Sequence, residues 1–134
     1  MAGYSARSLV DKLGIKSGTR IAIINAPRGY RATLGSLPPG VVLASAARGS
    51  FPFIQFFTRS RSLLQTKLAM LLRALEPDGA LWISWPKKAS GVATDMTEDA
   101  VREITLPLGL VDIKVAAVDD IWSGLKLVRR LRNR

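Results

Sequence analysis

The sequence predicts an α/β fold, an open three-layer arrangement in which helices cover a mostly parallel sheet of about six strands. Three observations predict it. Short apolar runs alternate with segments of helical periodicity, and prolines, glycines and aspartates separate them. The first run, Arg20–Ile24, is apolar on both faces, as in buried parallel strands. The last two runs are joined by a hairpin-length connection, which predicts an antiparallel strand at or near one edge.

The apolar runs predict strands that the turn residues on either side delimit. Pro52 lacks a backbone donor, so we expect it at the start of its strand. We expect the fourth and fifth strands to be neighbours in the parallel part of the sheet. The predicted strands are Arg20–Ile24, Val41–Ala44, Phe51–Phe57, Ala80–Trp85, Leu110–Val118 and Leu125–Arg130.

Helices are predicted between these strands. The longest has leucines at 64, 68, 71 and 75, which place one apolar stripe on a single face. Acidic residues in the first turn of the last helix agree with the helix dipole. The predicted helices are Ser5–Leu13, one or two turns at Tyr30–Leu34, a helix that Thr58 or Ser60 caps and that runs to Leu75, and a helix that Asp95 or Thr97 caps and that Pro107 and Gly109 end.

Composition limits the classes of function. The 134 residues, 48% of them hydrophobic, predict a single domain over 1–134, with residues 129–134 as a flexible basic tail. The chain has no cysteine and no histidine, which excludes disulfides and thiolate zinc sites and removes the commonest general base; we expect no metal site. No apolar run has the length of a membrane span, and residues 1–20 show no signal-peptide core, so we expect a cytoplasmic protein without a membrane partner.

Charge is unevenly distributed along the chain. The net charge is +10, with eleven basic residues and one acid in residues 1–75, an acidic stretch over 76–120, and five basic residues over 121–134. This asymmetry is compatible with an anionic partner, including nucleic acid, but runs of charge more often form only a solvated surface. The basic tail lacks interleaved aromatic residues, which argues against recognition of single strands.

Ligands of open α/β sheets bind at the carboxyl edge, where the loops that follow the parallel strands meet. In this chain the edge gathers the loops 25–30, 58–61, 85–95 and 119–124, with Arg59 among their cations. The predicted ligand-binding residues are Asn25, Arg28, Trp85, Lys87, Lys88, Ser90, Thr94, Asp95, Asp119 and Trp122.

Each part of this predicted site has a structural alternative. Lys87 and Lys88 beside hydroxyl donors can hold a phosphate or carboxylate while Trp85 stacks on a ring; alternatively the loop is solvated and Trp85 packs against the sheet. Asp119 and Trp122 can form a second wall, or simply a hairpin turn. Asn25 and Arg28 can touch an anion while Tyr30 stacks; alternatively residues 25–27 only end the strand and Tyr30 lies in the core, as we expect of Phe51, Phe53, Phe56 and Phe57.

Two segments and the terminal hairpin resemble class I S-adenosylmethionine methyltransferases, which have a Rossmann-like fold. Residues 75–83 (LEPDGALWI) are similar to the "L-x-P-G-G-x-L-x-I" step of that family, and residues 14–20 (GIKSGTR) to the segment before its first strand. The resemblance implies a glycine-rich loop after the first strand and an acid at the end of the second. Here Asn25–Gly29, with a proline and an arginine, and Ala44–Ala46 stand at these places. We therefore expect no cofactor, and the sequence argues against an enzyme without deciding the question.

Over nearly its full length the chain also resembles a bacterial family known only as domain of unknown function 3052. That resemblance implies the same fold and does not indicate any particular activity. The segments that carry it are residues 12–16, 25–27, 85–91, 94–99, 110–112, 118–120 and 122–125.

Three hypotheses follow from the sequence. The first is a non-catalytic or degenerate methyltransferase-like domain that binds a small anionic or nucleotide-like ligand at the carboxyl edge. The second is a basic protein associated with nucleic acid, and the third is an atypical S-adenosylmethionine-dependent methyltransferase. The catalytic residues, the oligomeric state and the ligand stay open at this stage.

Overall fold

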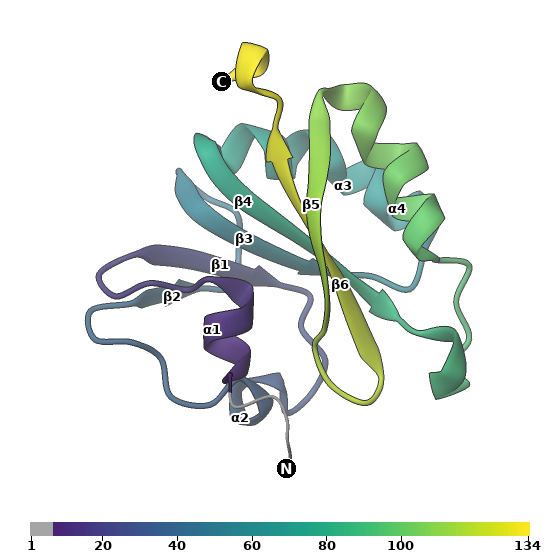
Figure 1. Cartoon of the computed structure of the whole chain (residues 1–134), viewed down its shortest axis with the longest axis horizontal. Coiled ribbons are helices and arrows are strands. Elements are labelled where there is room, and N and C mark those ends of the chain that lie inside the picture. Colours follow the sequence, from purple (N-terminus) through teal and green to yellow (C-terminus); the bar gives the residue numbers. More distant parts are fainter. Residues whose placement is uncertain (1–6) are drawn as a thin grey trace.

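Six strands form one mixed sheet in the order β2-β1-β3-β4-β6-β5, in a computed structural model that describes residues 7–134 (Figure 1). The strands are β1 (Arg20–Ile24), β2 (Val42–Ala44), β3 (Phe51–Phe57), β4 (Leu75–Pro86), β5 (Leu110–Ala117) and β6 (Trp122–Arg129). The helices are α1 (Leu9–Leu13), α2 (Tyr30–Leu34), α3 (Arg61–Ala74) and α4 (Glu98–Thr105), with 3-10 turns η1 (Lys88–Ser90), η2 (Leu106–Leu108) and η3 (Leu131–Asn133). The predicted start of the first helix at Ser5 lies outside the described residues.

The sheet is parallel from β2 to β4 and antiparallel from β4 to β5. The prediction that the fourth and fifth strands are parallel neighbours is wrong, because β6 lies between them and pairs with both. Burial explains the order. β6 buries Leu125, Leu127 and Val128 on its two faces, whereas β5 exposes Ile113 and Val115 and therefore suits the edge.

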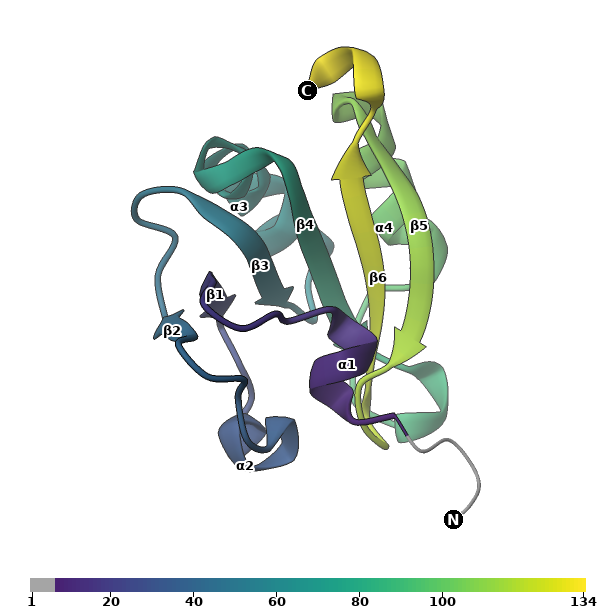
Figure 2. The same ribbon diagram turned by 60° about the vertical axis from the view of Figure 1, so that its left-hand side comes forward.

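Helices cover both faces of the sheet, which confirms the predicted three layers. Figure 2 shows α3 and α4 on one side of the sheet and α1 and α2 on the other. The α3–α4 side holds the larger core, and the leucine stripe predicted for α3 packs there. On the other side, Phe53, Phe57 and Trp82 from the sheet pack against Tyr30 of α2 and Leu13 of α1.

Local sequence explains where the helices begin. The Ser60 hydroxyl accepts a hydrogen bond from the Leu63 N–H at the start of α3, and the Thr97 hydroxyl accepts one from the Ala100 N–H at the start of α4. Of each predicted pair of caps, these two residues are therefore the ones that act. Within residues 7–134 no helix is long and apolar enough to cross a membrane.

Two strands begin earlier in the chain than predicted. β4 begins at Leu75, where that residue pairs with Phe51 before a shift in register. β6 begins at Trp122, so the hairpin connection is residues 118–121 and not 119–124. At the other end of β6, Arg129 is its last residue and η3 follows; the flexibility that the sequence predicts for residues 129–134 stays a prediction.

A chain of buried polar side chains crosses the α1–α2 side of the sheet. The Tyr30 hydroxyl donates to Gln55 Oε1 at 2.8 Å, and Gln55 Nε2 donates to Ser84 Oγ at 3.1 Å. Gln55 and Ser84 are fully buried, so each depends on this chain for its hydrogen bonds. Burial raises the pKa of Tyr30 above its ordinary value.

Replacing Tyr30 with Phe removes the only donor to Gln55 Oε1 that we find within residues 7–134. We expect Tyr30→Phe to lower the free energy of unfolding by about 1–3 kcal/mol, because a buried acceptor stays unpaired. Urea unfolding measures this, with Ser36→Ala as a control that removes an exposed hydroxyl. Equal stability of the Tyr30 variant and the wild type would show that the hydrogen bonds between Tyr30, Gln55 and Ser84 do not stabilise the fold.

The raised pKa of Tyr30 also predicts alkaline sensitivity. An unfolded tyrosine ionises near its ordinary value of 10.0, whereas Tyr30 stays neutral in the fold at that pH. Its stabilising contribution is therefore complete below pH 10 and is lost as the pH rises above it. Between pH 8 and pH 11, urea unfolding should show a smaller loss of stability for Tyr30→Phe than for the wild type. Equal losses in the two proteins would contradict the role of Tyr30 in the alkaline sensitivity.

Candidate functional site

The carboxyl ends of β1 and β3 and the amino end of β6 lie on the same side of the sheet, which we call its carboxyl edge. A cavity of about 410 Å³ lies there. Because β6 is antiparallel to β4, its first residue comes to the edge where the parallel strands end. This arrangement brings the predicted loops together. The cavity is lined by Asn25, Ala26, Pro27, Thr58, Arg59, Val92, Ile121 and Trp122.

Asn25 joins the ends of β1 and β3. Its backbone has a left-handed conformation, with φ of 62°, which asparagine tolerates better than most residues. Its side-chain amide donates to the Phe57 carbonyl at 2.7 Å. The amide nitrogen is therefore used within the protein, and Asn25 shapes the floor of the cavity.

Thr94 and Asp95 hold the loop after β4 against the loop after β3. The Thr94 hydroxyl donates to the Arg59 carbonyl at 2.6 Å. Asp95 Oδ1 accepts from the Arg61 backbone N–H at 2.8 Å, and Arg61 Nε donates to the Asp95 carbonyl at 2.8 Å. Neither Thr94 nor Asp95 lines the cavity; both fix the backbone that carries Arg59.

Asp119 and Phe57 position Trp122. Asp119 Oδ1 accepts from the backbone N–H groups of Ile121 and Trp122, at 2.8 Å and 2.7 Å. The Trp122 ring meets the Phe57 ring edge to face, with centroids 5.1 Å apart. Asp119 therefore acts through the turn, and Trp122 presents a partly exposed ring to the cavity.

Trp85 does not take part in this cavity, which corrects the prediction that it stacks on a ligand. Its side chain is 5% exposed and packs in the core on the α3–α4 side. Side chains alternate along a strand, so Trp85 shares its face with Leu81 and Ile83. Trp122 packs on the opposite face, and the two tryptophans do not share a pocket.

The other predicted residues surround the cavity without lining it. Lys88 is exposed on η1, and Lys87 is tied to the hairpin by its backbone N–H, which donates to the Ile121 carbonyl at 2.8 Å. Ser90 Oγ donates to the Lys87 carbonyl at 2.7 Å. Arg28 is exposed on the loop after β1.

Of the ten predicted residues, the cavity brings together Asn25 and Trp122. The other six lining residues belong to loops that the sequence places at this edge, but none of them is among the ten: Ala26, Pro27, Thr58, Arg59, Val92 and Ile121. The available signal was position. Thr58 and Arg59 directly follow a buried strand, and such residues point into the space at the carboxyl edge.

The fold is similar to that of solved methyltransferases. A methyltransferase from Aquifex aeolicus described as S-adenosylmethionine-dependent is 16% identical, with a TM-score of 0.63 over 89% of this chain and 86% of that chain. The N-methyltransferase NodS from Bradyrhizobium japonicum is 11% identical (TM-score 0.60; 90% of this chain, 92% of that chain). A ribosomal protein L11 methylase from Lactobacillus delbrueckii subsp. bulgaricus is 12% identical, with a TM-score of 0.59 over 91% of this chain and 75% of that chain. No protein-family model and no curated protein matches the chain. The comparisons confirm the methyltransferase-like fold.

This fold implies S-adenosylmethionine, but the residues at the carboxyl edge do not fit it in the usual way. A second cavity, of about 120 Å³, lies beside the ends of β1 and β2, with Ala44, Ser45 and Arg31 in its wall. Residues 7–134 supply no carboxylate to either cavity, and each cavity carries an arginine. The sulfonium cation would meet like charge, and the ribose hydroxyls would lack a carboxylate acceptor. The side chains favour an anionic ligand instead.

Removing the Asp119 carboxylate should loosen the turn that carries Trp122. We expect Asp119→Ala to lower the free energy of unfolding by about 1–2 kcal/mol, because two backbone N–H groups lose their acceptor. Asp119→Asn keeps an acceptor oxygen and should stay close to the wild type. Urea unfolding and the NMR signal of the Trp122 indole measure both effects; identical behaviour of the two variants would contradict this role.

Proposed function

We propose that this protein is a non-catalytic methyltransferase-like domain whose carboxyl-edge cavity binds a small anionic, nucleotide-like ligand. The observation that carries the proposal is that Arg59 and Trp122 both line a cavity to which residues 7–134 contribute no acidic side chain. The cavity volume of about 410 Å³ falls in the range of small-molecule sites.

The two side chains recognise different parts of such a ligand. Arg59 offers a guanidinium to a phosphate or carboxylate, a charge-assisted hydrogen bond that is stronger than a neutral one. Trp122 packs nearly at right angles to the Phe57 ring, and the partly exposed indole offers a planar surface to a ring of the ligand. Val92 and Ile121 add apolar surface beside it. Together they favour a ligand with one planar ring and one acidic group.

The lack of catalysis is part of the proposal. The chain has no histidine or cysteine, and the described lining has no carboxylate that could move a proton. An arginine side chain offers hydrogen-bond donors and no acceptor, so Arg59 can stabilise negative charge on a ligand but cannot act as a general base.

An atypical methyltransferase is the second candidate, and the fold similarity favours it. It requires a mode of cofactor binding that uses neither a glycine-rich loop nor an acid at the end of β2. The relation to the bacterial family of unknown function, a bacterial origin and a cytoplasmic location are further parts of the proposal, and they rest on the sequence alone.

Ligand titration tests the proposal. With the ¹⁵N-labelled protein at physiological salt, we expect adenosine 5′-monophosphate to shift the amide signals of Thr58, Arg59 and Trp122. Arg59→Ala should weaken its binding roughly tenfold or more, since a charge-assisted hydrogen bond contributes about 1.5–3 kcal/mol. Trp122→Leu should weaken the binding of both adenosine and the nucleotide, because the variant lacks the indole surface on which the base would stack.

Control variants separate the cavity from general charge. Arg48→Ala removes the same charge from the opposite edge of the sheet and should leave the affinity unchanged. Lys87→Ala/Lys88→Ala tests the lysine pair that the sequence predicts and should have a smaller effect than Arg59→Ala. Equal affinity of Arg59→Ala and the wild type would refute the site. Binding of S-adenosylmethionine without the nucleotide would favour the methyltransferase.

A further inference from the structure

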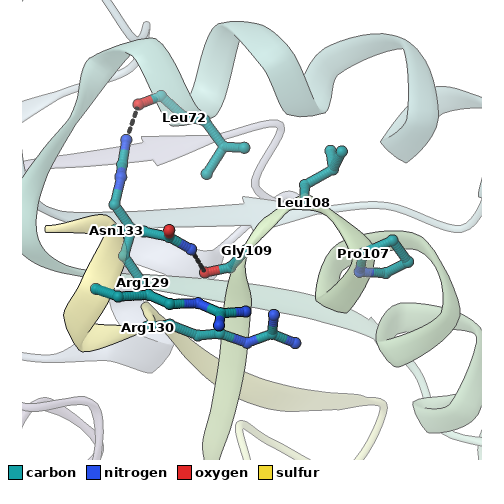
Figure 3. A pocket seen from close by; sticks show the side chains of 8 residues that line it. Leu72, Pro107, Leu108, Gly109, Arg129, Arg130 and Asn133 are labelled. Carbon is teal, nitrogen blue, oxygen red and sulfur yellow. Dashed lines mark hydrogen bonds between the residues drawn. The ribbon is translucent and has the colours of Figure 1, made fainter.

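Another cavity, of about 430 Å³, lies at the opposite end of β6, at the amino edge of the parallel strands. It is formed where the end of α3, the η2 turn and the segment after β6 meet (Figure 3). The cavity is lined by Leu72, Pro107, Leu108, Gly109, Arg129, Arg130, Arg132 and Asn133.

Arg129 carries an unsatisfied donor at this cavity. Its Nη2 donates to the Leu72 carbonyl at 2.6 Å, at the end of α3. Its Nη1 is buried and has no hydrogen-bond partner within residues 7–134, and it is the one buried side-chain atom of this kind there. A buried donor without a partner is costly, and one on a charged group especially so. Because Arg129 also lines the cavity, an anion bound there would lie beside a guanidinium group that lacks one acceptor.

The surrounding charge has one sign. Arg130 and Arg132 line the cavity with Arg129, and no acidic side chain of the described chain lines it. None of the three arginines forms a salt bridge with a residue of the 7–134 segment. Three arginines therefore line one cavity without a salt-bridge partner in the described residues, which favours an anionic ligand.

The segment after β6 is held against Gly109, and it brings Arg130 and Arg132 to the wall of the cavity. The Arg130 backbone N–H donates to the Gly109 carbonyl at 3.0 Å, and Asn133 Nδ2 donates to the same carbonyl at 3.2 Å. Gly109 has a φ of 91°, and a Cβ there would lie 2.5 Å from Asn133 Nδ2. Glycine at 109 thus permits the close approach on which the shape of the cavity depends.

We propose that this cavity binds the phosphate group of a small phosphorylated molecule. Guanidinium groups match the geometry of phosphate oxygens and bind them through two parallel hydrogen bonds. The concave shape favours a small ligand over a nucleic acid strand, which needs an extended basic track. The proposal is independent of the function proposed above, because the two cavities lie at opposite edges of the sheet and share no lining residue.

Titration with inorganic phosphate and pyrophosphate tests the proposal. At physiological salt we expect both to shift the Arg129 Nε–Hε signal and the amide signals of Gly109 and Leu72 in ¹⁵N spectra. Arg130→Gln/Arg132→Gln should weaken the binding of pyrophosphate roughly tenfold or more, because two charged donors are lost. Both side chains are partly or fully exposed, so the fold should persist, and the dispersion of the spectrum verifies this.

A charge-matched variant and a second ligand make the test specific. Arg48→Gln/Lys67→Gln removes two exposed charges that line none of the cavities described here, and it should bind pyrophosphate as the wild type does. Equal weakening in both double variants would overturn the proposal. Shifts caused by a short DNA duplex but by neither phosphate would also overturn it and would identify a nucleic acid surface.

Discussion

The antiparallel pairing of β6 with β4 is the constraint on which the rest of the structure depends. Gly124 makes it possible, because a Cβ at that position would lie 3.0 Å from Trp82 Cε3 and 3.5 Å from Ser84 Oγ. Trp82 in turn donates from Nε1 to the Leu13 carbonyl at 3.0 Å, which attaches α1 to the same part of the sheet. A side chain at 124 would require the Trp82 indole or β6 to move by a few tenths of an ångström, at the strand pair to which α1 is also attached.

This pairing places the two ends of one strand at the two edges of the sheet. Trp122 begins β6 and reaches the carboxyl edge, and Arg129 ends it and reaches the amino edge. Each end becomes the wall of a different cavity. The geometry of both cavities therefore depends on the same register between β4 and β6, even though they share no side chain.

Local patterns in the sequence predicted most of the helices and strands. They could not predict the order of the last strands or the face on which Trp85 lies, because both depend on packing between distant residues. The leucine stripe of α3 and the burial of the four phenylalanines follow from periodicity and composition. The insertion of β6 between β4 and β5 depends on a pairing between distant residues, so no local signal marks it. The same holds for Trp85, since the face on which a strand residue lies depends on its register. Arg59 was placed correctly at the edge because that inference needed only the order of the elements.

The acidic stretch of the sequence also acquires a structural meaning. Arg102 bonds Glu98 at 2.6 Å, Asp112 at 2.9 Å and Asp99 at 3.4 Å, so three acids gather around one cation on α4 and β5. This contact holds the pKa of Asp112 below its usual range, and Arg102 is the main cause. Exposed ion pairs of this kind add little stability. Their larger consequence is where the negative charge lies: these three acids are grouped around Arg102, and none of them lines the cavities of Arg59 and Arg129. Within residues 7–134 neither Arg59 nor Arg129 forms a salt bridge, and this supports the anionic ligands proposed for the two cavities.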